Sequence, residues 1–262
     1  MSEVPICIDV SHHQGTIDWE EVRAAGVLGM IHKATEGTSF VDDMRAENCA
    51  AAKKAGIAIS TYFWLKPGNA AAQADFYLET IQPVKGERVV IDFEEDGCDL
   101  DDLYEAIGAI KQYDDSLQIT VYSGHLLKEL LTGRDDYLAD NTDLWLAQYT
   151  SSEDNISWSE ATYPQWMLWQ YSESGTIPGI DDAYVDLDKF NGGVAHFLRW
   201  MHPKGHAPDP KPPQPPEPDQ DVAVVDVAVT APDDVKVKVS INGVMLRKPR
   251  WRQIRRGPDV AT

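Results

Sequence analysis

The sequence has no long hydrophobic run and no recognisable export signal. No stretch of about 18 apolar residues occurs. The N-terminus, MSEVPICIDV, lacks a basic region followed by an apolar one. We therefore expect neither a membrane span nor a signal peptide, and we expect synthesis in the cytoplasm.

Cysteine and basic residues are also scarce. Cys7, Cys49 and Cys98 have long, irregular spacings without a C-x-x-C pair, which argues for buried free thiols rather than a disulfide framework or a zinc cluster. Lys and Arg number 23 against 43 Asp and Glu, and residues 1–202 hold 13 of the basic residues and 35 of the acidic ones. Because phosphate binding depends on Lys and Arg, this part of the chain is not expected to bind nucleic acid.

Proline is concentrated in one stretch. Residues 203–220, PKGHAPDPKPPQPPEPDQ, contain eight of the 16 prolines, and such a stretch forms an extended, semi-rigid spacer. We therefore predict a large domain over residues 1–202, a linker over 203–221 and a small segment over 222–262. The large domain is long enough to bury a single core.

The small C-terminal segment is predicted to be β-rich and basic. Apolar and polar residues alternate over 222–248, and Asn242-Gly243 is a strong hairpin signal. Between Lys236 and Arg256 there are eight basic residues and no acidic one. Two interpretations stay open: a solvated strand face with a loose end, or a patch for an anionic surface such as a cell-envelope polymer, lipid head groups or nucleic acid.

The large domain contains eight apolar runs typical of strands, and helical patterns between the early ones. Alternating strands and helices predict an α/β fold with a parallel sheet, and eight strands can close into a modified barrel with about five helices; an open doubly wound sheet is the alternative. The strand candidates are ICIDV, LGMIHKA, IAISTYFWL, RVVIDFE, QITVYSG, DLWLAQY, WMLWQYS and AYVDLDKF. The helix candidates are Asp18–Ala25, Asp42–Ala55, Ala70–Ile81, Leu100–Tyr113 and His125–Leu131.

One strand candidate ends in a pair of carboxylates. In VVIDFEE, strand alternation sends Asp92 and Glu94 to the same face, about 6.6 Å apart along the chain. Repulsion and apolar walls should raise the pKa of one carboxyl and leave the other charged, as general acid catalysis at a glycosidic oxygen requires. Glu94, with its longer reach, suits the acid. Taken alone, the motif is also compatible with a surface strand end or a pair of metal ligands.

Other strand ends carry acidic and aromatic side chains. Functional groups of parallel barrels gather at the carboxyl ends of strands, and carboxylates among Trp and Tyr are typical of a sugar site. Each aromatic side chain is also compatible with a core position. The candidates are Asp9, Tyr62, Trp64, Tyr122, Trp145, Gln148, Trp169, Tyr171 and Asp186.

Two other chemistries have weaker support. His12 and His13 are candidate zinc ligands, but only His32 offers a further histidine at a strand end, so we expect no metal. Ser11 and Ser123 are candidate nucleophiles, but neither lies in a G-x-S-x-G turn.

Several motifs in order resemble glycoside hydrolase family 25, the muramidases found among bacterial, fungal and bacteriophage lysozymes. They are IDVSHHQGTIDW, DFE, LWLAQY, LWQYSESGTIPGI and VDLDKF, and the resemblance spans about residues 4–193. It implies a modified barrel of eight strands and about five helices. It also implies cleavage of the β-1,4 bond between N-acetylmuramic acid and N-acetylglucosamine in bacterial peptidoglycan, without a metal or organic cofactor.

The resemblance also implies roles for individual residues. Glu94 matches the general acid and base, and Asp92 matches the partner of the substrate's 2-acetamido group. Asp9 and Asp186 match acidic positions that bind substrate or tune the pair. Tyr62, Trp64, Tyr122, Trp145 and Trp169 match the sugar subsites more loosely. Substrate assistance is the favoured route, in which the acetamido oxygen attacks the anomeric carbon, while retaining and inverting routes stay open.

Rival functions and the place of action also stay open. The alternatives are a non-catalytic cell-wall carbohydrate-binding protein on the same barrel, and a chitinase-like hydrolase of a related polymer. Without a visible signal peptide, we expect the enzyme to reach the wall on release at lysis, as a phage or prophage endolysin does, or through a dedicated secretion route. The basic segment would tether an acidic barrel to an anionic wall through the proline linker.

Overall fold

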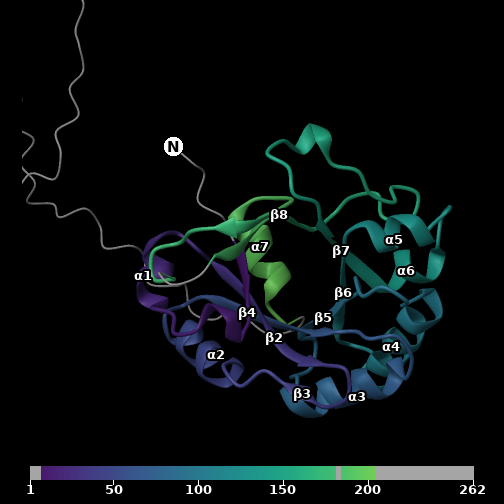
Figure 1. The fold of residues 1–262 in the computed structure, drawn as a ribbon, viewed down its shortest axis with the longest axis horizontal. Coiled ribbons are helices and arrows are strands. Elements are labelled where there is room, and N and C mark those ends of the chain that lie inside the picture. The colour runs from purple at the N-terminus through teal and green to yellow at the C-terminus, as the bar shows by residue number, and fades with distance from the viewer. Residues whose placement is uncertain (1–6, 181–183, 204–262) are drawn as a thin grey trace, which may run out of the picture. The chain divides into compact units, whose positions relative to one another are not determined.

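The computed structural model describes residues 7–180 and 184–203, which form a closed barrel (Figure 1). Eight strands close the ring in the order β1-β2-β4-β5-β6-β7-β8-β9-β1, and the two-residue strand β3, Phe40–Val41, pairs with β2. The predicted C-terminal segment, and the linker beyond Pro203, lie outside the described residues. The barrel strands are β1 Cys7–Val10, β2 Gly29–Glu36, β4 Ala58–Trp64, β5 Arg88–Asp92, β6 Gln118–Ser123, β7 Thr142–Ala147, β8 Leu168–Gly175 and β9 Val185–Phe190.

One barrel strand runs against the other seven. From β1 through β8 the barrel neighbours pair in parallel, whereas β9 is antiparallel to both β8 and β1. The connection from Gly175 to Val185 is shorter than the roughly dozen residues that a parallel crossover needs. The start of β9 therefore meets the ends of the other strands at one end of the barrel, here called the mouth; the opposite end is the floor. The eight predicted strands are confirmed, but the sheet is not wholly parallel.

Five helices cover the outside of the barrel where the sequence predicts them, and two more were not predicted (Figure 1). Local capping explains several starts: the Asp18 carboxylate accepts from two backbone N–H groups of α1, and that of Asp99 does the same for α4. Among the described helices, none combines the length and apolarity of a membrane crossing. The predicted helices are α1 Trp19–Ala24, α2 Arg45–Lys54, α3 Ala70–Ile81, α4 Leu100–Tyr113 and α5 His125–Leu130; the others are α6 Asp136–Asn141, α7 Val194–Met201 and the 3-10 turns η1 His12–Gln14 and η2 Glu153–Asn155.

Strand alternation separates two apolar layers. Outward-facing side chains such as Phe63 and Ile91 pack among residues of α3 and α4, while inward-facing ones such as Ile31 and Val90 pack inside the ring. The cysteines are free thiols: Cys7 and Cys98 are buried as predicted, and Cys49 is half-buried. The inner face of each strand is therefore the face that can present side chains to the mouth.

Helix α7 closes the floor of the barrel. Phe197, Trp200 and Met201 are buried in the inner apolar layer, and Figure 1 shows α7 within the ring of strands. Arg88, at the start of β5, donates from Nε to the carbonyl oxygen of Trp200 at 2.9 Å, and its guanidinium lies 3.9 Å from the Trp200 ring centre. Arg88 also donates to Thr120 Oγ1, Gln118 Oε1 and Asp143 Oδ2, so this polar network and α7 together fill the lower interior and leave the mouth as the open end.

Candidate active site

The four predicted acidic residues converge on the inner face at the mouth. Asp92 ends β5, Glu94 follows two residues later, and Asp9 lies in β1 directly opposite Asp186 in β9. Asp186 is near the start of its strand rather than at the end, and it reaches the mouth because β9 is antiparallel. Asp9 and Asp92 are buried at 6% and 4% exposure, whereas Glu94 and Asp186 are half-buried. The cluster therefore has a buried part and a part open to solvent.

Burial and mutual repulsion raise the pKa values of these carboxyl groups. Desolvation is the largest cause for each, and it raises the pKa of Asp186 to about 6. The charge of Glu94 further raises the pKa of Asp92. The pKa of Glu94 is lowered by His125 and raised by the charge of Asp186. A carboxyl that keeps a proton close to neutral pH can serve as a general acid.

Gln170 connects the acidic cluster to two tyrosines. Its Nε2 donates to Asp9 Oδ2 at 2.8 Å, while its Oε1 accepts from the hydroxyl groups of Tyr122 at 2.8 Å and Tyr149 at 3.0 Å. Gln170 and Tyr149 were not among the residues predicted from the sequence. The available signal was alternation along β8, because Leu168 and Gln170 face the interior and the conspicuous Trp169 between them does not.

A third residue that was not predicted, Asp188, lies deeper on β9. It has no exposed surface, and its Oδ1 accepts from Trp145 Nε1 at 2.8 Å. Trp145 is itself only 2% exposed and packs edge-on against Tyr122. The structure thus places Trp145 beneath the mouth, as a support for the residues above it.

The remaining predicted residues divide between the mouth and the outer layer. Tyr62 and Trp64 face inward from β4 and are half-buried. Trp64 donates from Nε1 to Glu95 Oε2 at 2.9 Å. Trp169 packs in the outer apolar layer at 3% exposure and donates to the carbonyl oxygen of Gln148. The Gln148 side chain bonds Lys128, Ser157 and Asn155, so it fastens the loop after β7.

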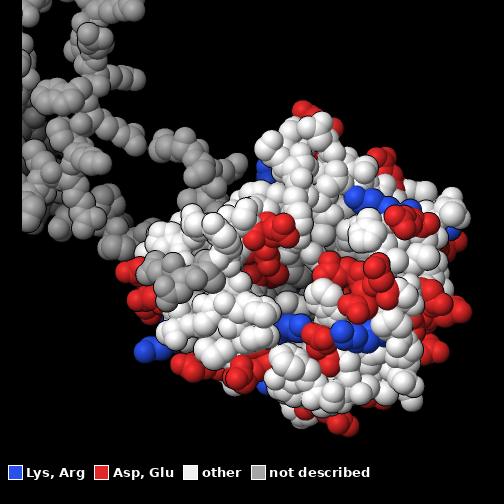
Figure 2. Space-filling view, viewed as in Figure 1, with Lys and Arg blue, Asp and Glu red and all other residues white. Residues whose placement is uncertain are grey.

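A line of ion pairs borders the mouth beside Trp64. Lys33 Nζ lies 2.6 Å from Glu36 Oε2 and over the Trp64 ring, and Lys66 joins Glu36 to Glu95 at 2.9 and 3.6 Å. The charge of Lys33 lowers the pKa of both Asp92 and Glu94 against the effect of burial. Figure 2 shows a hollow over the centre of the strand ring, with acidic side chains on two sides and basic ones along a third.

Comparison with known proteins gives the family. Residues 8–180 match the model of glycosyl hydrolases family 25. The chain belongs to this family. It is 28% identical over 211 residues to lysozyme M1 of Streptomyces globisporus, covering 73% of this chain and 69% of that protein. It is 29% identical over 192 residues to the autolytic lysozyme of Clostridium acetobutylicum, covering 71% of this chain and 56% of that protein, so it spans little more than half of the latter.

A solved structure supports the same assignment for this family 25 hydrolase. The bacterial lysozyme of Streptomyces coelicolor superposes with a TM-score of 0.66 at 27% identity, covering 75% of this chain and 96% of that one. The protein is a glycoside hydrolase of the muramidase type, and the predicted modified barrel, family and peptidoglycan substrate class are confirmed.

The histidines and serines considered for other chemistry have structural partners in the family 25 barrel. His12 Nδ1 lies 2.8 Å from Asp42 Oδ2, and the buried His32 contacts the carbonyl oxygen of Lys33. The Ser11 hydroxyl caps η1, and the Ser123 hydroxyl accepts from a backbone N–H of α5. Within the described ranges, no three His, Cys, Asp or Glu side chains are arranged to hold a metal ion.

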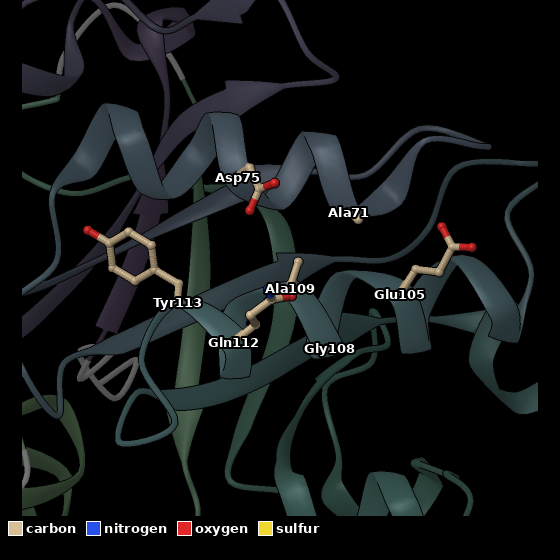
Figure 3. A pocket seen from close by; sticks show the side chains of 7 residues that line it. All are labelled: Ala71, Asp75, Glu105, Gly108, Ala109, Gln112 and Tyr113. Carbon is tan, nitrogen blue, oxygen red and sulfur yellow. The ribbon is translucent and has the colours of Figure 1, made fainter.

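The hydrolase also has a groove on its outer surface, away from the acidic cluster. It occupies about 510 Å³ between α3 and α4, where Asp75 faces Glu105 and Tyr113 across the gap (Figure 3). Gly108 leaves the middle of the groove open, since no atom lies within 4 Å of where its Cβ would be. None of the residues that line it belongs to the mouth.

Proposed function

We propose that Glu94 is the general acid and base for cleavage of the β-1,4 bond between N-acetylmuramic acid and N-acetylglucosamine. The observation that carries this proposal is its position beside Asp92 and Asp186 at the mouth, half-buried and with a raised pKa. Glu94 donates its proton to the leaving oxygen as the glycosidic bond breaks, and its carboxylate then takes a proton from the attacking water. Partial burial favours the first step, and partial exposure gives water access for the second.

Asp92 is the proposed partner of the substrate's acetamido group. It is 4% exposed, and its Oδ1 has no hydrogen-bond donor among the described residues. An unsatisfied buried carboxylate oxygen is costly unless a ligand supplies the donor. The acetamido N–H supplies it, and the hydrogen bond directs the acetamido oxygen to the anomeric carbon. The bond from that oxygen to carbon forms as the glycosidic bond breaks, and water later opens the cyclic intermediate.

Four aromatic side chains are the proposed sugar contacts. Trp64 and Tyr149 offer accessible ring surface at the mouth, with Tyr62 and Tyr122 behind them nearer the carboxylates. The other three predicted residues support the mouth from behind, since each makes contacts that hold a strand or loop; they are Trp145, Gln148 and Trp169. We therefore assign direct binding to the first group and support to the second.

The proposed reaction is tested by the chemistry of the new sugar end. Purified peptidoglycan is digested with the wild type, Glu94→Gln and the matched control Glu95→Gln, and the products are reduced with borohydride. We expect reduced muramic acid from the wild type and the control, and none from Glu94→Gln at an unchanged melting temperature. Reduced glucosamine ends would contradict the bond assignment. No cleavage of several different walls by the wild type would favour the non-catalytic binding protein.

The C-terminal basic segment is proposed to hold the enzyme on an anionic polymer of the cell wall, its proposed place of action. The support is the sequence, which has eight basic and no acidic residues between Lys236 and Arg256, whereas the barrel residues are strongly acidic. A linked second site raises the local enzyme concentration at the wall. Removing residues 204–262 should weaken wall binding and leave cleavage of short soluble fragments unchanged. Wall binding that is unchanged after this truncation would contradict the proposed tether.

A further inference from the structure

Phe40 is an exposed aromatic residue to which the proposed reaction gives no role. It belongs to the two-residue strand β3 and is 39% exposed. A single exposed ring is common on protein surfaces and indicates nothing by itself. The position of Phe40 is what distinguishes it, because the strand register places it on the same face as the residues of the mouth.

The register of four strands puts Phe40 in one row with Asp92. Phe40 stands opposite Glu36 of β2, which in turn stands opposite Trp64 of β4. Trp64 stands opposite Asp92 at the end of β5. Residues that stand directly opposite each other in neighbouring strands share a face of the sheet. Phe40 is therefore three strand spacings, roughly 14 Å, from Asp92 along this row, with Trp64 between them.

Contacts with Lys33 join the rings of Phe40 and Trp64 into one surface. The Lys33 Nζ lies 5.5 Å from the centre of the Phe40 ring and 5.1 Å from that of the Trp64 ring. One ammonium group is thus within cation–π distance of both rings. The His12 ring also packs against Phe40, with 5.7 Å between the ring centres. The aromatic surface of the mouth therefore continues past Trp64 to β3.

The polar groups beside Phe40 suit a neutral ligand that is rich in hydroxyl groups. The ion pairs between Phe40 and Trp64 balance two ammonium groups against two carboxylates; they are formed by Lys33, Glu36, Lys66 and Glu95. An anionic peptide would meet as many like charges as opposite ones. Sugar hydroxyl groups, in contrast, can donate to the carboxylates and accept from the ammonium groups. Charge therefore favours a sugar over a peptide stem as the occupant.

We propose that Phe40 is a substrate-binding residue that contacts the glycan chain of peptidoglycan on the far side of Trp64 from the cleaved bond. The inference rests on the proposed function, because it extends the same binding site. The Phe40 ring stacks on the apolar face of a sugar that is not one of the two joined by the cleaved bond. No bond of that sugar changes during the reaction, so the contact is equally strong in the ground state and the transition state. It strengthens the binding of long chains and leaves the chemical step unchanged.

Chain length separates this contact from those at the cleaved bond. The short substrate is the peptide-free tetrasaccharide GlcNAc-MurNAc-GlcNAc-MurNAc, whose susceptible bond is central, so that it extends only two sugars to either side. The long substrate is glycan strands freed of peptides by an amidase. In the full chain, Phe40→Ala is expected to raise KM for long strands about three- to tenfold at unchanged kcat, and to change KM for the tetrasaccharide less than about twofold. An equal effect on both lengths, or no effect on either, would overturn the proposal.

Val41→Ala is the matched control for the ring. Val41 is the next residue of β3 and is 43% exposed, but it stands opposite Thr35 and points to the other face. Val41→Ala and Phe40→Tyr, which keeps the ring, should both retain the wild-type KM for long strands. A loss in either that equals the loss in Phe40→Ala would show that β3 itself, and not the ring, is responsible.

Peptide-bearing strands distinguish the two parts of the substrate. If Phe40→Ala raises KM only when the stem peptides are present, the ring binds the peptide and the proposal is overturned. If the wild type cleaves neither length, the proposed function fails instead. Calorimetric titration of the wild type and Phe40→Ala with long peptide-free strands then still tests the contact, and equal affinities would overturn it.

Discussion

The Nε2 of Gln170 donates a hydrogen bond to Oδ2 of Asp9 over 2.8 Å, and this bond joins β8 to β1 across the inner face of β9. This side-chain contact therefore connects the two strands that pair with the antiparallel strand β9. Because Asp186 and Asp188 lie on β9, the register of β1 and β9 sets where these residues stand relative to Asp9. The arrangement of the acidic cluster depends on strands from both ends of the described chain.

Trp64 and Trp169 should respond to truncation in opposite ways. Trp64→Ala removes ring surface at the mouth and is expected to raise KM for peptidoglycan fragments about tenfold with little change in stability. Trp169→Ala opens a cavity in the outer layer, where the ring is 3% exposed, and is expected to cost about 3–5 kcal/mol of unfolding free energy. Steady-state kinetics and urea denaturation check both, and the reverse pattern would refute the proposed division between binding and support.

Lys33 should control the pH at which the enzyme works. Its charge lowers the pKa of Asp92 and Glu94, so Lys33→Met should raise both. If activity requires ionised Asp92 and protonated Glu94, both limbs of the kcat/KM profile move to higher pH, by roughly half to one pH unit. The methionine keeps an apolar stem near the Phe40 and Trp64 rings. Lys66→Met is the control, because Lys66 lies on the exposed side of the same ion-pair line. In Lys33→Met, profile limbs that stay in place or move to lower pH would contradict the prediction.

The barrel could be predicted from the sequence, but the inner face of its strands could not. Apolar runs marked all eight barrel strands, and helical patterns between the early runs marked the first five helices. Strands covered on both faces are apolar at nearly every position, so periodicity does not tell which alternate residues point inward. For this reason Trp169 was predicted as a site residue, whereas Gln170, its neighbour on the other face of the strand, was not.

Residues at the strand ends were predictable for a different reason. Asp9, Asp92 and Glu94 follow apolar runs directly, so their position at one end of a parallel barrel follows from strand direction. Asp188 gave no such signal, because it lies within a strand whose reversed direction is set by tertiary pairing. Trp145, from whose indole N–H it accepts a hydrogen bond, is remote in sequence and becomes its neighbour only in the folded barrel.

Asp186 should make stability depend on pH. Its pKa in the folded protein is raised to about 6, mainly by burial, so the folded state binds more protons than the unfolded state between about pH 4 and pH 6. Its contribution to stability is therefore lost as pH rises through that window. Asp186→Asn cannot ionise, and its stability relative to the wild type should increase from pH 4 to pH 6 by up to about 1 kcal/mol, allowing for solvent screening, and then level off. Melting curves at several pH values check this, and a constant difference would contradict it.

Two glycine substitutions should have opposite effects on stability. A Cβ on Gly29 would lie 2.3 Å from Cζ of the buried Phe197 in α7, so Gly29→Ala is expected to cost about 1–3 kcal/mol. Gly108→Ala, in α4 with open space around it, should stabilise the protein by about 0.5–1 kcal/mol. Urea denaturation measures both. The double variant Gly29→Ala/Phe197→Leu should recover part of the loss, and a lack of recovery would show that Phe197 is not the obstacle.

Because α7 closes the floor, the described barrel opens at the mouth. Arg88, Phe197 and Trp200 fill the lower interior, so a glycan chain lies across the mouth and does not thread through the ring. In the proposed reaction, the water that opens the cyclic intermediate therefore enters through the mouth, after the leaving half of the glycan has moved away.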